Sequence, residues 1–242
     1  MRYGIFSDVH ASCEALEAVL VALKEDGADQ LLCGGDLVNY GAEPEACAAK
    51  IQEVAHAVVA GNHDWAAVGK FSPEFFHEAA KVSLTWTIKK LSKSTKQYLK
   101  ELPAVWKDEA VTLVHGALYE PEEFHYLLDI QGAEKHFEVQ ETPVSFVGHT
   151  HVPAILVKEA SGQVRLLEET KVTLKEHAKY LVNVGSVGQP RDRTPEAAYG
   201  VYDTRLNELQ IKRVPYDIGA VQKKIQSAGL PELFSNRLPK GS

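Results

Sequence analysis

The stretch YGIFSDVH, residues 3–10, decides the fold, because it is a short apolar run that stops at an acidic residue. Such a run is typical of a buried β-strand. A stretch with leucine and valine side chains at helical spacing follows from about residue 12 to residue 26, and Ser12 is its predicted N-cap. The sequence therefore predicts a strand that leads into a helix, with Asp8 and His10 in the connection.

The same pattern occurs again in the next 55 residues. QLLCGGD (30–36) is a second predicted strand, a helix is expected over residues 44–54, and AHAVVAGNHD (55–64) is a third strand. Strands that alternate with helices in this way predict parallel strands joined by right-handed crossovers. All three strands end in polar residues, and ligands of such sheets bind at the carboxyl ends of the strands.

The rest of the chain predicts further strands around one long helical region. Residues 72–101 are expected to be helical, residues 110–117 form a strand, and residues 143–159 form two strands that break at a histidine pair and Pro153. Antiparallel strands are expected within 164–169, 179–192 and 197–217, and a short helix within 218–227. We expect a single domain over residues 1–242, in which residues 229–242 form a frayed tail.

The composition narrows the classes of partner. The chain has 242 residues, of which 45% are hydrophobic and 24% charged, with a formal net charge of −7. An acidic protein has no general attraction to nucleic acid or anionic membranes. Its apolar runs are too short to cross a bilayer, and the strand pattern at the N-terminus leaves no room for a signal peptide. Cys13, Cys33 and Cys47 form no CxxC pair, so we expect buried thiols in a reducing cytoplasm.

Five polar groups occur at predicted strand ends, and together they suggest a metal site. Each of them alone is a common turn, but five in order are hard to explain as turns. In VGHTH (147–151), a single threonine directs both histidine rings to the same side of an extended chain. The donors in these groups are Asp8, His10, Asp36, Asn62, His115, His149 and His151.

Seven oxygen and nitrogen donors are too many for one ion but suit two. One shared carboxylate can bridge two ions that lie about 3.5–4 Å apart. Because the set contains no cysteine, copper(I) and iron–sulfur chemistry are disfavoured, whereas manganese, iron, zinc, nickel and cobalt all suit. The sequence therefore favours two divalent or transition metal ions, of a kind that it does not specify.

The ordered motifs DVH, GGD, GNHD, HG and GHTH resemble the five-motif signature of the calcineurin-like metallophosphoesterase superfamily. NVGSVGQPRD (183–192) also resembles a stretch of its small bacterial and archaeal members. The resemblance implies an α/β fold of the metallophosphoesterase type. This fold is a four-layer αββα sandwich of two mixed β-sheets flanked by helices, with a dinuclear metal site at one edge.

The resemblance also implies a role for each matching residue. The ligands of one metal ion are Asp8, His10, Asp36 and His151. The ligands of the other are Asp36, Asn62, His115 and His149, so that Asp36 bridges the two ions. Asn62 and His63 are the implied catalytic pair, with His63 as general acid, a role for which a histidine titrates in a suitable range. Arg191 is the implied substrate-binding residue, although a charged surface turn explains it equally well.

The implied activity is metal-dependent hydrolysis of phosphodiesters or small phosphomonoesters by in-line attack of a metal-bridging hydroxide. One alternative is a non-catalytic metal-binding scaffold with the same fold. Another is a serine/threonine-type protein phosphatase, but Asn39 and Tyr40 stand where that branch has an acidic residue followed by arginine. The net charge argues against long nucleic acid as substrate. The physiological substrate, the metal pair, homo-oligomerisation and substrate contacts by Arg193 or His125 stay open.

Overall fold

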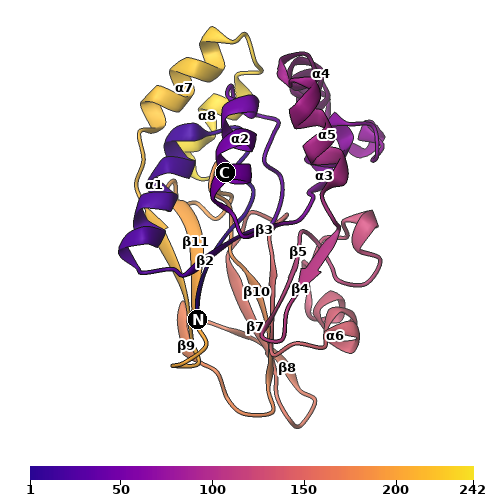
Figure 1. The fold of residues 1–242 in the computed structure, drawn as a ribbon, viewed down its shortest axis with the longest axis vertical. Helices are drawn as coiled ribbons and strands as arrows, with labels where there is room; N and C mark the ends of the chain where they lie inside the picture. The colour runs from indigo at the N-terminus through magenta and orange to yellow at the C-terminus, as the bar shows by residue number, and fades with distance from the viewer.

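The structure is a computed structural model that describes residues 1–242, and it contains two six-stranded β-sheets (Figure 1). The first sheet has the strand order β3-β2-β1-β11-β12-β9. Its strands are β1 (Arg2–Phe6), β2 (Gln30–Cys33), β3 (Ala57–Val58), β9 (Lys171–Thr173), β11 (Ala197–Asp203) and β12 (Glu208–Val214). β1, β2 and β3 pair in parallel, as predicted, whereas β1 pairs with β11 antiparallel.

The second sheet has the order β4-β5-β6-β10-β7-β8 and is also mixed. Its strands are β4 (Val105–Lys107), β5 (Val111–Val114), β6 (Val144–Val147), β7 (Ala154–Lys158), β8 (Val164–Leu167) and β10 (Lys179–Asn183). β6 pairs in parallel with both β5 and β10, and the other pairs are antiparallel. The carboxyl ends of β5, β6 and β10 therefore lie at one edge of this sheet.

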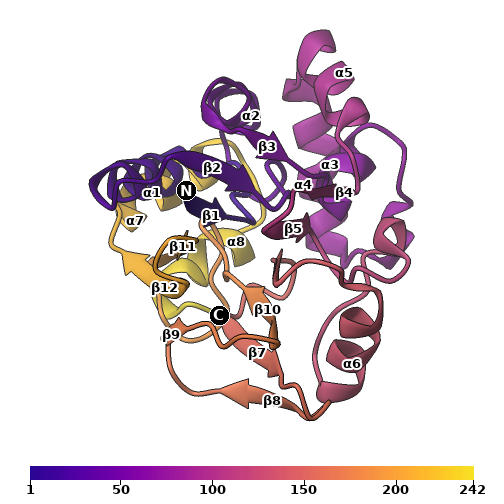
Figure 2. The same cartoon turned by 60° about the horizontal axis from the view of Figure 1, so that its bottom comes forward.

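Helices cover the outer faces of both sheets (Figure 2). The helices are α1 (Cys13–Glu25), α2 (Pro44–Val54), α3 (Asn62–Ala67), α4 (Glu78–Lys90), α5 (Lys93–Glu101), α6 (Ile130–Val139), α7 (Ile218–Ser227) and α8 (Leu233–Asn236). Three short 3-10 helices are η1 (Pro73–Phe75), η2 (Pro121–Glu123) and η3 (Leu238–Lys240). Side chains of α1 and α2 pack on the first sheet, and those of α6 pack on the second. The predicted four-layer sandwich is confirmed.

The largest apolar contact between the sheets follows from the alternation of side chains along the strands. Tyr3 and Ile5 of β1 point into the space between the sheets, where they join Val182 of β10 in one buried cluster. Leu181, the neighbour of Val182, points to the opposite face and packs in the cluster beneath α6. The two sheets are thus fixed face to face, which holds their strand ends together at one edge.

The structure differs from the sequence prediction in several elements. The helical region predicted over residues 72–101 consists of η1, α4 and α5. The third strand, predicted within residues 55–64, has only two residues, and α3 begins at Asn62. The sequence analysis did not identify β4 or α6. Residues 229–242 are not a frayed tail: Phe234 and Leu238 are fully buried against α7, so α8 and η3 are packed elements. None of the helices combines the length and the hydropathy needed to span a membrane.

Candidate functional site

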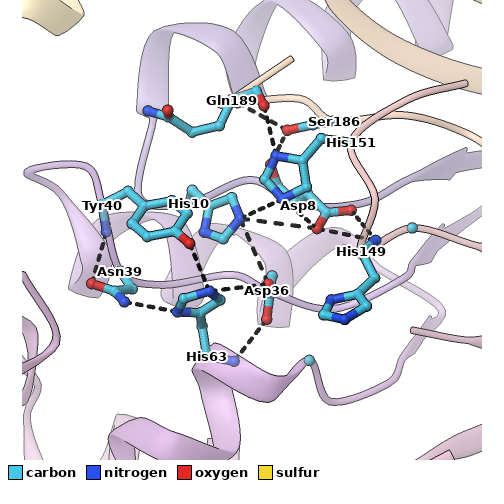
Figure 3. A network of polar contacts seen from close by, with 12 residues as sticks. Asp8, His10, Asp36, Asn39, Tyr40, His63, His149, His151, Ser186 and Gln189 are labelled. Atoms are coloured by element: carbon cyan, nitrogen blue, oxygen red, sulfur yellow. Dashed lines mark hydrogen bonds and ion pairs between the residues drawn. The ribbon is translucent and has the colours of Figure 1, made fainter. Parts of the chain in front are cut away.

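Six of the seven residues predicted as metal ligands form two overlapping groups of donor atoms at the edge where the strands of both sheets end. Figure 3 shows five of them: Asp8, His10, Asp36, His149 and His151. Asp8 and Asp36 follow β1 and β2, Asn62 follows β3, and His115 and the GHTH motif follow β5 and β6. All seven side chains are buried. We call this set the His/Asp cluster: Asp8, His10, Asp36, Asn62, His115, His149 and His151.

The first part of the His/Asp cluster contains two carboxylates and two imidazoles. One donor atom from each of four residues lies within 4.8 Å of the others: Asp8, His10, Asp36 and His151. His151 Nε2 is 3.1 Å from Asp8 Oδ1, and His10 Nε2 is 3.6 Å from Asp36 Oδ2. This grouping is the same as the first ligand set predicted from the sequence.

The second part shares Asp36 with the first. Asp36, His115 and His149 also have donor atoms within 4.8 Å of one another. His115 Nε2 lies 3.4 Å from Asp36 Oδ2 and 3.1 Å from His149 Nδ1. Asn62 begins α3, and the adjacent backbone N–H of His63 donates to Asp36 Oδ1 over 2.9 Å. The Asp36 carboxylate is therefore common to both groups.

Backbone carbonyls orient three of the imidazoles. The Nδ1 atoms of His10, His115 and His151 contact the carbonyl oxygens of Val38, Gly34 and Gln189 at 3.2, 2.7 and 2.6 Å. A carbonyl only accepts hydrogen bonds, so each Nδ1 carries a proton, and in the neutral ring each Nε2 carries a lone pair. Metal-ligating histidines are held in this way by a partner on the other ring nitrogen.

The donor atoms of the cluster fit metal ions. The lone pairs of His10 Nε2 and His151 Nε2 face each other over 3.2 Å, which is repulsive unless a cation or a proton lies close to both. Asp36 Oδ2 and Asn62 Oδ1 are buried and have no hydrogen-bond partner. Buried acceptors without a partner are rare in proteins, because their desolvation is costly. Bound cations would satisfy these atoms.

The two carboxylates of the cluster are ionised. Burial alone raises the pKa of Asp8, but the adjacent His151 and His115 outweigh this effect and hold the pKa below its usual value. Burial also opposes ionisation of Asp36, and His115 and His63 lower its pKa in the same way. Anionic oxygens next to imidazole nitrogens match the mixed ligand set expected from the sequence.

The backbone at the site is held in an unusual conformation. Five cluster residues have positive φ angles: Asp8, His10, Asp36, His149 and His151. This left-handed region is unfavourable for residues with a Cβ atom, and it is often found at functional sites. Two glycines permit the close approach of the chain, because a Cβ at Gly61 would lie 2.0 Å from Asp36 Oδ1 and one at Gly148 would lie 2.3 Å from Asp8 Oδ2.

The NVGSVGQPRD stretch supports the cluster from the side of the second sheet. The Ser186 hydroxyl donates to the Asp8 carbonyl oxygen over 2.8 Å, and the Gly188 N–H donates to the same oxygen over 3.0 Å. The Gln189 N–H in turn donates to Ser186 Oγ over 2.9 Å. Since Ser186 is fully buried, its hydroxyl positions the left-handed Asp8.

His63 lies beside the cluster, and its two ring nitrogens contact Asn39 and Tyr40. Asn39 Oδ1 accepts from the Tyr40 N–H, so its amide nitrogen faces His63 Nδ1 over 2.7 Å. His63 Nδ1 is therefore an acceptor, and the proton is on Nε2, which lies 3.0 Å from the Tyr40 hydroxyl. Burial lowers the pKa of His63 to about 4, and Asp36 offsets this only partly. The sequence predicted a histidine that titrates near the working pH, whereas burial in the folded chain lowers this pKa.

Asp64 stabilises the loop after β2 instead of contacting the His63 ring. Its Oδ2 accepts from the N–H groups of Asp36 and Gly61 at 2.8 and 3.0 Å. Its Oδ1 accepts from the N–H of Leu37 at 2.9 Å. Asp64 therefore fixes the backbone on which the shared carboxylate is mounted.

Comparison with known proteins agrees with this geometry. The sequence pattern of the calcineurin-like phosphoesterase superfamily domain matches residues 1–207. The chain belongs to this superfamily. The family predicted from the five motifs is thereby confirmed, and the fold at the site is that of a metallophosphoesterase.

Relatives of this phosphoesterase family member come from archaea and bacteria. An uncharacterized protein of Methanocaldococcus jannaschii is 36% identical over 239 residues, which cover 97% of this chain and 96% of that protein. Phosphodiesterase YfcE of Escherichia coli is 27% identical over 213 residues, which cover 84% of this chain and 88% of YfcE. The crystal structure of a metallophosphoesterase from Sphaerobacter thermophilus superposes with a TM-score of 0.88 at 35% identity and covers 100% of this chain and 99% of its own.

Two arginines of this family member lie at the rim of the cluster. Arg191 follows the loop that holds Asp8, is half-buried, and has a buried Nε without a partner. Arg237, between α8 and η3, lies 5.0 Å from the Tyr40 ring, and its Nη2 is also buried without a partner. Burial and the charge of Arg191 lower the pKa of Arg237 to about 10. Neither guanidinium forms an ion pair with a carboxylate, so both are available to an anion.

Sequence reasoning missed Arg237 because it assigned this segment to a frayed tail. The only available signal was the apolar spacing of Leu230, Phe234 and Leu238, all of which are buried. The other two candidates for substrate contact lie outside the cluster. Arg193 is exposed, and the His125 ring contacts Glu120 and stacks on Tyr119.

Proposed function

We propose that this protein is a dinuclear-metal-dependent phosphoesterase that hydrolyses phosphodiesters or small phosphomonoesters. The observation that carries the proposal is the shared Asp36 carboxylate, which belongs to two groups of donor atoms at once. Asn62 completes the second group through its unpartnered Oδ1. When bound there, two metal ions supply an activated water as nucleophile and neutralise negative charge on the phosphoryl group.

The residues of the chain would then orient the substrate and supply a proton. His63 Nε2 carries a proton and lies at the edge of the cluster, 3.9 Å from Asp36 Oδ2, so we assign it to the leaving-group oxygen as general acid. The Tyr40 hydroxyl and the Asn39 amide hold the ring in this orientation.

The two rim arginines would bind the phosphoryl oxygens. A guanidinium binds an anionic oxygen more strongly than a neutral donor does, and each of these groups has a buried N–H that lacks a partner. Arg191 is the substrate-binding residue proposed from the sequence, and we add Arg237. Arg237 places positive charge on the side of the cluster that faces α8.

The alternatives are less well supported. A scaffold role shares this metal site but gives no function to His63, whose ring nitrogens contact Asn39 and Tyr40 beside the cluster. A protein phosphatase would need the acidic residue and arginine that Asn39 and Tyr40 replace, and these two residues contact His63 instead. We further propose small phosphate esters as partners and a cytoplasmic location, which the three free thiols support.

The test uses the full chain loaded with Mn²⁺, Fe²⁺, Zn²⁺, Ni²⁺ or Co²⁺. Metal content is measured, and hydrolysis of bis-p-nitrophenyl phosphate and p-nitrophenyl phosphate is followed. We expect two ions per chain and turnover of at least one ester, with loss of both after chelation. A folded protein that binds two ions of each metal in turn and hydrolyses neither ester would support the scaffold role.

A further inference from the structure

A second feature lies directly beside the His/Asp cluster: an apolar pocket of about 680 Å³ on the outer face of the second sheet. It is enclosed by the beginning of α6 and by β7, β8 and β10, and its size is in the range of small-molecule sites. We call it the apolar pocket and define it by its aliphatic lining, which includes Leu128, Ile130, Val152, Leu156, Leu166 and Leu181.

Several of these side chains are exposed although they are large and aliphatic. Leu128 is 77% exposed and Leu166 is 57% exposed, and they belong to the same pocket. Apolar groups that remain in contact with water in one concave place indicate a binding site, because a ligand that covers them gains free energy.

The apolar pocket borders the cluster. Tyr126, in its wall, stacks on the ring of His149 with 3.8 Å between the ring centroids. Thr150, between the two histidines of GHTH, is a second wall residue, and Arg191 is a third. A molecule whose phosphate group reaches the cluster and Arg191 would therefore extend its ester group into this pocket.

The polar groups of the pocket offer little for the recognition of heteroatoms. The Asn183 amide nitrogen donates to the Gly148 carbonyl and to Thr150 Oγ1, and its oxygen accepts from the Gly185 N–H. Asp129 Oδ1 accepts from the N–H of Gly132 at the start of α6. These side chains are thus already occupied, while Arg191 retains an unpartnered N–H.

The aromatic content of the pocket also argues against a nucleobase. Tyr126 is the one aromatic side chain of the lining, and the His149 ring already covers one face of it. Base recognition uses free stacking surfaces and hydrogen-bonding side chains. The lining instead provides aliphatic surface and one cation, which matches an alkyl group attached to a phosphate.

We propose that the apolar pocket binds the alkyl ester arm of a phosphodiester whose phosphorus reacts at the His/Asp cluster. The inference rests on the proposed function and adds the substrate class to it: phosphodiesters with an alkyl chain on one ester oxygen. The scissile bond is the other ester bond, so water adds to phosphorus, the second alcohol departs with a proton, and the alkyl phosphate monoester is released.

The experiment varies the arm and keeps the leaving group constant. The substrates are p-nitrophenyl methyl phosphate, p-nitrophenyl octyl phosphate and thymidine 5′-(p-nitrophenyl phosphate), all below the concentration at which the octyl ester aggregates. A fully buried methylene is worth about fourfold in binding. Since the pocket is partly open, we expect kcat/KM of the octyl ester to exceed that of the methyl ester by at least about 10-fold.

Two pocket variants and one matched control locate the effect. Leu166→Gln and Leu128→Gln should each reduce the octyl-to-methyl ratio by at least about threefold, because each removes aliphatic surface from the pocket. Leu206→Gln changes a leucine with the same 57% exposure in the turn between β11 and β12, and it should retain the ratio.

The outcomes separate the inference from the proposed function. Equal kcat/KM for the methyl and octyl esters, or the highest value for the thymidine ester, would overturn the alkyl assignment while leaving a phosphoesterase. An octyl preference that is retained in both pocket variants would mean that the octyl group binds elsewhere, and it would also overturn the alkyl assignment. No turnover of any diester, the methyl ester included, would instead contradict the proposed function.

Discussion

The His/Asp cluster and the apolar pocket lie side by side and meet at His149 and Arg191, yet they are built in opposite ways. In the cluster, the side chains are buried and backbone carbonyls fix three of the imidazoles. In the pocket, Leu128 and Leu166 project into solvent and form no polar contacts. Under the proposed function, the reaction depends on groups tied to the backbone, whereas the choice of substrate depends on side chains that can change without disturbing them.

The largest effect is expected from a substitution of the shared Asp36 carboxylate, which belongs to the cluster and not to the pocket. In Asp36→Ala, we expect both metal ions to be lost and kcat/KM to fall by at least about 10³-fold, because two-metal stabilisation of the transition state is worth several kcal/mol. Metal analysis and rates with bis-p-nitrophenyl phosphate measure this. Asp217→Ala removes only the cap of α7 and serves as a control that should keep two ions. Two ions bound to Asp36→Ala would contradict the bridge.

The role of His63 predicts an effect that depends on the leaving group. In His63→Ala, we expect the rate to fall by about 10²-fold for esters with an alkyl leaving group and much less for p-nitrophenyl esters, which need no general acid. Rates over a series of aryl and alkyl leaving groups give the dependence. His56→Ala is the control, since His56 lies before β3 and contacts Trp106. An equal loss over the whole series would mean that His63 only supports the structure.

Substitution of Arg237 tests whether the rim of the cluster takes part in substrate binding. In Arg237→Met, the packing on Tyr40 and Phe234 is largely kept but the charge is removed. We expect KM to rise by about 10-fold with a smaller change in kcat, because a hydrogen bond to a charged group contributes about 1.5–3 kcal/mol. Arg193→Met, at an exposed position, should leave KM unchanged. An unchanged KM in Arg237→Met, with an unchanged melting temperature, would remove Arg237 from the site.

His136 is a buried histidine outside the cluster, and it is expected to affect the stability of the protein and not its metal content. His136 accepts from the Leu118 N–H at Nδ1, and its Nε2 lies 2.9 Å from Ser145 Oγ. Burial lowers its pKa to about 3, whereas an unfolded histidine titrates near 6.5. Its contribution to stability is therefore complete above about pH 6.5 and is lost as the pH falls toward 3, by up to about 1.4 kcal/mol per pH unit.

Urea unfolding at several pH values between 7.5 and 5 measures this contribution. His136→Gln should flatten the fall in unfolding free energy relative to the unmodified protein, and its metal content at pH 7.5 should be unchanged. The exposed His177 is the matched site, and His177→Gln should retain the full slope. Identical slopes in all three proteins would show that His136 does not resist protonation.

The cluster could be predicted from the sequence because each ligand is in a short motif at a strand end. Asp8, Asp36 and Asn62 follow parallel strands of one sheet, and the glycines beside them mark close approach of the chain. Patterns of this kind can be recognised from residues that are neighbours in the sequence, without information on distant contacts. The boundaries of α1, α2 and α7 were also visible, because apolar spacing is local as well.

The rim and the pocket could not be predicted, because long-range packing creates them. Phe234 stacks on Tyr40 with 4.5 Å between the ring centroids. This contact packs the segment that was predicted as a tail against the fold, and it places Arg237 at the rim of the cluster. The pocket depends on α6, which the sequence analysis did not identify, and on the outer face of β7 and β8. The state of His63 was also missed, since it depends on burial and on the orientation of the Asn39 amide.

The hydrogen bond from Ser186 to the Asp8 carbonyl joins residues that are 178 positions apart, and it has a consequence for folding. The same two parts of the chain also meet where β1 pairs with β11. Contacts between such distant segments form slowly, because a long loop must close first. In refolding experiments, uptake of a coloured ion such as Co²⁺ should therefore lag behind the recovery of helical circular dichroism, and the colour would report that the chain has reached its final topology.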